Sequence, residues 1–99
     1  MNAVRTLTAP ASATVPRIGH GFRLQWEEAQ SCFVLLYPEG MVKLNQSAGE
    51  IMKRVDGRRD VAAIVADLET AFATTGLERD VLAFVELAQR QRWLDWTPA

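Results

Sequence analysis

Few side chains in this 99-residue sequence have the chemistry that a catalytic site requires. The one histidine, His20, lies in a Gly-His-Gly segment, which favours a loop residue over a general base. The one cysteine, Cys32, opens the most apolar segment of the chain, where a cysteine is more often a small buried residue than a nucleophile. No histidine is close to Cys32 in sequence, so a nucleophile and its base would have to meet through the fold.

The glycines and carboxylates give no sign of a cofactor site. The six glycines never form the spacing of a phosphate-binding loop. A single cysteine supplies neither a disulfide nor a Cys/His cluster for a structural metal. The carboxylates of the second half are interpreted as helix caps and solvated charges, among them Asp56, Asp60, Asp67 and Glu69. We therefore expect no catalytic residue, no cofactor and no metal.

The overall composition favours one soluble domain whose partner is neither a nucleic acid nor a membrane. Eleven Lys and Arg residues against twelve Asp and Glu residues give a formal charge of −1, which attracts no polyanion. No apolar stretch approaches the roughly 20 residues that cross a bilayer. Residues 1–16 lack the apolar run of a secretion signal, and with the single cysteine this favours a cytoplasmic location.

Composition also suggests where the domain begins and ends. Residues 1–16 are dominated by Ala, Thr, Ser and Pro, which bury little, and they are predicted to be a mobile tail. A single domain is expected over residues 17–96, because the chain is too short for two independent cores. Residues 97–99 are expected to be a short C-terminal tail.

Three strands are predicted in the first half of this domain. Apolar and polar residues alternate over residues 22–27, and residues 32–37 form a continuous apolar run. A Pro-Glu-Gly segment then favours a tight hairpin turn, with Gly40 at positive φ, before a third strand over residues 41–44. An antiparallel meander is expected, with the third strand at an edge. The middle strand is apolar on both sides, which predicts that both faces of the sheet are covered.

The period changes to that of a helix after Asn45. Either Asn45 or Ser47 can cap this first helix, Ser47 and Glu50 resemble a capping box, and Gly57 is predicted to end the helix in a left-handed conformation. Asp60 is predicted to cap a second helix.

A Thr-Thr-Gly turn over residues 74–76 separates the second helix from a third helix over about residues 78–92. Residues 93–96 are expected to form an extended tail. Together these elements predict an α+β fold of the winged helix-turn-helix type, with a three-stranded antiparallel sheet followed by a three-helix bundle.

The third predicted helix has more apolar surface than a surface helix needs. Its apolar side chains spread over an arc of about 220° at 100° per residue. In one interpretation the helix is central in a small core. In the other, one flank faces the open edge of the third strand and forms a peptide groove, with Leu82, Val85, Glu86 and Gln89 along it.

The sequence resembles the PqqD family over about residues 16–94. The most specific part of the match is the run LLYPEGMVKLN at residues 35–45, which is preceded by GFRLQWE at residues 21–27. The match continues through Ser47–Ile51, Asp56-Gly57, Asp80-Val81, Phe84 and Trp93-Leu94.

The resemblance implies a peptide-recognition domain without enzyme activity. In this family the protein binds the precursor peptide PqqA and presents it to PqqE, a radical S-adenosylmethionine enzyme of pyrroloquinoline quinone (PQQ) biosynthesis. The iron–sulfur clusters and S-adenosylmethionine belong to PqqE, so no cofactor is implied for this chain. In related domains the peptide adds as a strand beside the third strand, against the third helix. Carried over, this implies contacts at Met41, Val42, Lys43 and Leu44.

Three points stay open from the sequence. Lys43 can contact an acidic peptide residue or protect an edge strand from aggregation. A winged helix can also belong to a small DNA-binding regulator, although the third helix mixes acidic and basic residues and shows no basic stripe. An open edge permits a monomer or a homodimer, and an enzyme site completed across a dimer by Cys32 or His20 is a third class of function.

Overall fold

The computed structural model describes residues 9–97. Residues 1–8 and 98–99, which belong to the two predicted tails, lie outside the described residues. The elements in chain order are β1 (Arg17–Ile18), β2 (Arg23–Glu27), a 3-10 turn (Glu28–Gln30), β3 (Cys32–Tyr37), β4 (Gly40–Lys43), α1 (Gln46–Lys53), α2 (Val61–Ala71), α3 (Glu78–Arg90) and β5 (Leu94–Asp95). The predicted α+β class, a three-stranded antiparallel sheet with three helices, is confirmed.

The main sheet is the predicted antiparallel meander, in the order β2-β3-β4. The bounds of β3 are those predicted, whereas β2 and β4 each differ from the prediction by one residue. Tyr37 pairs with Gly40, so Pro38 and Glu39 form the turn by themselves. The predicted positive φ at Gly40 is wrong, because this glycine is already a strand residue.

Helix α1 begins as predicted but ends earlier. The side-chain oxygen of Asn45 accepts a hydrogen bond from the Ala48 N–H at 2.8 Å, so Asn45 and not Ser47 is the N-cap. The predicted capping box is wrong, because the Glu50 carboxylate pairs with Arg54. Gly57 does adopt a positive φ of 77°, but it lies in the loop after α1, which ends at Lys53.

The start of α2 is capped from two directions. The Asp60 side chain accepts a hydrogen bond from the Ala63 N–H at 2.8 Å, as predicted. The two residues before Ala63 find their partners in the N-terminal segment. The Val61 N–H donates to the Thr14 carbonyl, and the Ala62 N–H donates to the Ser12 carbonyl. The segment before Arg17 therefore satisfies donors that a helix start leaves unpaired. The mobility of residues 1–16 as a whole stays a prediction.

A second, smaller sheet joins the two ends of the described chain. Strand β1 pairs with β5, and the Gly19 N–H donates to the Trp93 carbonyl at 2.7 Å. The predicted extended tail after α3 thus forms a strand. Helix α3 ends at Arg90, two residues before its predicted end.

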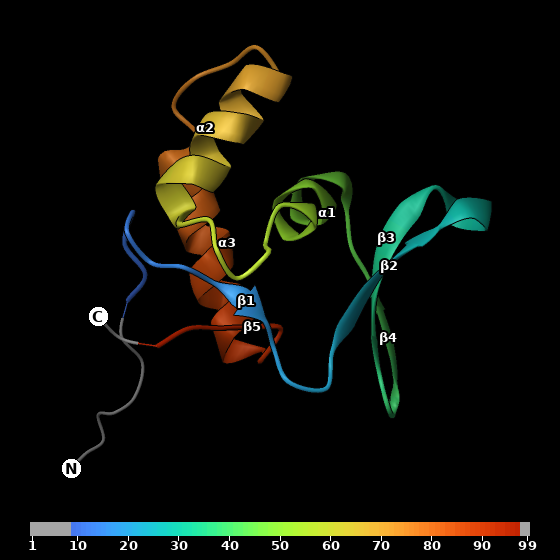
Figure 1. Cartoon of the computed structure of the whole chain (residues 1–99). Coiled ribbons are helices and arrows are strands. Elements are labelled where there is room, and N and C mark those ends of the chain that lie inside the picture. Colours follow the sequence, from blue (N-terminus) through green and yellow to red (C-terminus); the bar gives the residue numbers. More distant parts are fainter. Residues whose placement is uncertain (1–8, 98–99) are drawn as a thin grey trace.

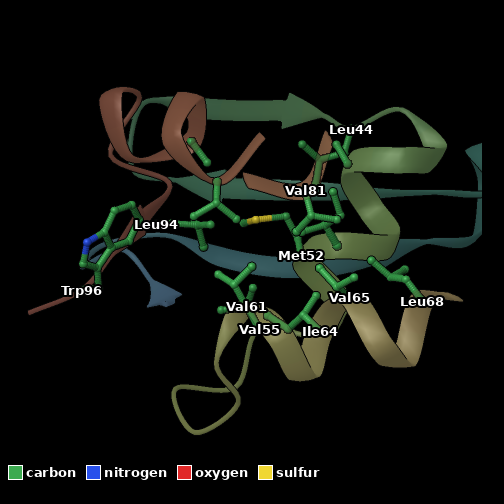
Figure 2. Close-up of a cluster of buried hydrophobic side chains, with 14 of the residues drawn as sticks. Leu44, Met52, Val55, Val61, Ile64, Val65, Leu68, Val81, Leu94 and Trp96 are labelled. Carbon is green, nitrogen blue, oxygen red and sulfur yellow. The ribbon is translucent and has the colours of Figure 1, made fainter. Parts of the chain in front are cut away.

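The hydrophobic core lies around α1. Figure 1 shows α1 between the three-stranded sheet on one side and the α2–α3 pair on the other. Met52 of α1 is fully buried, and Figure 2 shows its side chain in the middle of the cluster, near Val81. The helices lie on one side of the sheet. On the other side Val34 of the middle strand is also completely buried, so both faces of β3 are covered there, although within residues 9–97 no helix packs on the second face. Met41, whose side chain belongs to the other face, is 48% exposed.

A group of ion pairs holds the end of α1 to α2. The Arg54 guanidinium, which is 11% exposed, donates to the carboxylates of Glu50 and Asp67. Burial alone would lower the pKa of Arg54, but these two hydrogen bonds hold that pKa above its ordinary value. In the following loop the backbone N–H groups of Arg59 and Arg58 donate to Asp56 and lower the pKa of its carboxyl.

Replacing Arg54 with methionine is expected to lower the free energy of unfolding by about 1–3 kcal/mol, because Glu50 loses its partner in a half-buried position. Urea unfolding followed by circular dichroism measures this change. Arg90→Met is the control, since the exposed pair of Arg90 with Glu86 contributes no more than about 0.5 kcal/mol. Equal effects of the two substitutions would contradict the structural role of Arg54.

Candidate peptide-binding groove

Strand β4 leaves one edge of the main sheet open within the described residues. The Leu44 N–H donates to the Phe33 carbonyl of β3 at 3.0 Å, so the backbone of Leu44 faces β3. Backbone groups alternate in direction along an antiparallel strand, and Val42 therefore faces β3 as well. The N–H and C=O groups of Met41 and Lys43 face the open edge, where an added strand can pair with them.

A groove of about 360 Å³ lies beside this edge, between the end of β4, α1 and α3. Its apolar wall comes from Phe84 and Leu87 of α3 and from Trp93, whose ring lies 6.5 Å from the ring of Phe84. Leu87 is 46% exposed although it is a large apolar side chain on a regular helix. Lys43 and Leu44 form the strand side of the groove. An extended peptide at the β4 edge would therefore meet an apolar surface on its helix side.

Met41 and Lys43 present backbone groups at the open edge, and the backbone of Val42 faces β3. Lys43 and Leu44 line the groove. The predicted helix residues lie elsewhere. Val85 is completely buried in the core. At 100° per residue, Leu82, Glu86 and Gln89 lie about 100° or more around α3 from both Phe84 and Leu87, and none of the three lines the groove. Peptide contacts of these four residues stay a prediction. The groove residues Phe84 and Leu87 belonged to the same wide apolar arc, and periodicity alone does not distinguish its two flanks.

The residues considered for catalysis are not gathered at the groove. His20 is exposed in the loop between β1 and β2, and Cys32 is half-buried at the start of β3. Within residues 9–97 no group of three or more His, Cys, Asp or Glu side chains could hold a metal ion. Over the same residues no helix is long and apolar enough to cross a membrane.

The charges of α3 do not form a basic surface. Its first turn is acidic, with Glu78 and Asp80, and Arg90 in the last turn pairs with Glu86 at 3.2 Å. A recognition helix for DNA needs cations that neutralise phosphates. The charge pattern therefore offers no support for a DNA-binding role.

The fold and the groove define a class of protein: a small α+β domain with an open strand edge beside the apolar flank of its last helix. A family model described as coenzyme PQQ synthesis protein D (PqqD) matches residues 32–94. The PqqA binding protein of Pseudomonas aeruginosa is 58% identical over 90 residues, which cover 90% of this chain and 98% of the relative. The PqqA binding protein of Azotobacter vinelandii is 55% identical over 82 residues, with 82% and 89% covered.

Solved structures agree with the sequence comparison. The solution structure of the PqqD truncation of Methylobacterium extorquens PqqCD, described as a stand-alone recognition element for ribosomally synthesised and modified peptides, superposes with a TM-score of 0.75 at 32% identity. The alignment covers 89% of this chain and 96% of that one. Crystalline PqqD from Xanthomonas campestris gives a TM-score of 0.53 at 27% identity, with 96% and 99% covered. This chain belongs to the PqqD family.

Proposed function

We propose that this chain is a non-catalytic peptide chaperone of PQQ biosynthesis that binds the precursor peptide PqqA and presents it to the radical S-adenosylmethionine enzyme PqqE. The observation that carries the proposal is the open β4 edge directly beside the apolar groove of α3. It is supported by relatives that are named PqqA binding proteins and by a structural neighbour described as a peptide recognition element.

In the proposed complex PqqA adds to the sheet as a fourth strand next to β4. The backbone groups of Met41 and Lys43 supply hydrogen bonds that tolerate many peptide sequences. Alternate side chains of a strand point to opposite faces, so every second residue of the peptide meets Phe84 and Leu87. Burial of these peptide side chains supplies the selectivity, and Lys43 favours a nearby acidic residue.

The same geometry supports the proposed presentation to an enzyme. The helices lie on one side of the sheet, so the side chains of an added strand that point to the other side remain accessible (Figure 1). A partner enzyme can then reach them while the peptide stays bound. In this proposal the radical chemistry and its cofactors belong to PqqE, and the chain acts in the cytoplasm as a monomer or homodimer.

Replacing Leu87 with alanine is expected to weaken PqqA binding at least about fivefold, because a half-exposed apolar side chain that lines the groove is lost. Isothermal titration with synthetic PqqA measures the change. The matched control on the same helix is Gln89→Ala, for which we expect less than about a twofold change. If Gln89→Ala weakens PqqA binding and Leu87→Ala does not, the peptide lies on the other flank of α3.

A further inference from the structure

We propose that the groove continues past the first turn of α1 into a second apolar subsite, which holds an apolar side chain of the same bound peptide. The inference rests on the proposed function and extends it to peptide specificity. A second hollow of about 330 Å³ lies between the start of α1, the end of α2 and the start of α3. Leu68, Phe72, Leu77 and Val81 form its apolar lining.

The two hollows are neighbours that share part of their walls. Ser47, Ile51 and Asp80 line both the groove beside β4 and the second hollow. A peptide that leaves the β4 edge toward α1 therefore meets the second hollow without crossing the core. We call this second hollow the Phe72 subsite.

The exposure of Phe72 supports a ligand at this position. The apolar stripe of α2 runs from Val61 to Phe72, and its other members, Ile64, Val65 and Leu68 included, are at most 7% exposed. Phe72 is 48% exposed. Large apolar side chains left open beside a hollow mark a binding surface more often than isolated ones do. Residues 9–97 include five exposed large apolar side chains, and three of them follow the proposed path of the peptide. Met41 lies on the edge strand, Leu87 lines the groove and Phe72 lines the subsite.

Strand polarity identifies which part of the peptide enters the subsite. An added strand that continues the antiparallel sheet runs opposite to β4, so its N-terminal end lies beside Leu44 and α1. The residues that reach the Phe72 subsite are then those that precede the paired strand.

Asp80 stands where the two hollows meet, and within residues 9–97 it takes part in no ion pair. A carboxylate at this point favours a positively charged peptide residue between the paired strand and the apolar anchor. The recognised pattern is therefore an apolar residue, then a basic residue, then the paired strand.

A ladder of PqqA peptides shortened from the N-terminus tests the subsite. Each peptide is titrated into the wild-type protein, Phe72→Ala and the control Val15→Ala, which removes a 38% exposed apolar side chain that lines neither hollow. For the wild type and the control, we expect one truncation step ahead of the paired strand to weaken binding about fivefold or more. In Phe72→Ala the full-length peptide should already be weakened by this factor, and the step should disappear.

A second readout needs no substitution. Methyl signals of Leu68 and Leu77 should shift when full-length PqqA binds, and should stay in place with the peptide that lacks the anchor. Equal truncation losses in wild type and Phe72→Ala, or unmoved methyl signals, would overturn the subsite while strand-edge binding persists. No binding of full-length PqqA by the wild type would instead remove the proposed function and the subsite with it.

Discussion

Lys43→Pro is expected to weaken PqqA binding by about 30-fold or more while the protein stays folded. Proline removes the N–H that faces the open edge of β4, and its ring occupies the space of the incoming strand. A lost main-chain hydrogen bond that leaves the peptide carbonyl unpaired costs about 1–3 kcal/mol, and the displaced strand adds to that loss. Because the Lys43 N–H does not face β3, the three-stranded sheet itself keeps its hydrogen bonds.

Lys43→Ala is the matched control, since it removes the charge and keeps the N–H. We expect a change of less than about fivefold, as for an exposed ion pair. Isothermal titration gives the affinities, and circular dichroism with amide NMR spectra shows that both variants are folded. If Lys43→Pro binds as tightly as the wild type, the edge-strand account is wrong. Equal losses in the two variants would mean that the charge, and not the strand edge, holds the peptide.

Met52→Ala is expected to lower the free energy of unfolding by about 2–5 kcal/mol, the largest effect on stability among these substitutions. The Met52 side chain is fully buried in the middle of the core, where α1 meets the other helices (Figure 2). Truncation leaves a cavity that the surrounding helices fill only in part. Urea unfolding followed by circular dichroism measures the loss.

Met41→Ala is the control for Met52→Ala, because the same side chain is removed from an exposed position on the sheet. Its expected effect on stability is within about 0.5 kcal/mol. Residues of α1 and α3 line the groove. At urea concentrations near the unfolding midpoint of Met52→Ala, this variant should therefore also bind PqqA more weakly than the wild type does. Equal destabilisation by the two substitutions would contradict the position of the core.

The parts of the fold that were predicted correctly depend on neighbours in sequence. The alternation before Glu27, the apolar run of β3 and the Asn45 and Asp60 caps each require only a few consecutive residues. The third strand was predicted over Met41 to Leu44, and β4 lies one residue earlier, over Gly40–Lys43, with an open edge within the described residues.

The parts that sequence reasoning missed depend on contacts between distant segments. The pairing of β1 with β5 requires a close approach in which a Cβ on Gly19 would lie 2.1 Å from the Arg92 carbonyl oxygen, and the sequence shows only a glycine there. The flank of α3 that lines the groove was not identified from the sequence for a related reason. Its apolar arc includes both flanks, and the packing of α3 against α1 and α2 decides which one faces β4.

The most direct test of the central claim is an isothermal titration of this protein with the PqqA peptide encoded beside it, with duplex DNA as the control titrant. The account predicts saturable binding of one peptide per chain and no heat from DNA beyond dilution. Binding of DNA together with no binding of PqqA would contradict it, and the α3 flank would then have to be interpreted as a DNA-recognition surface.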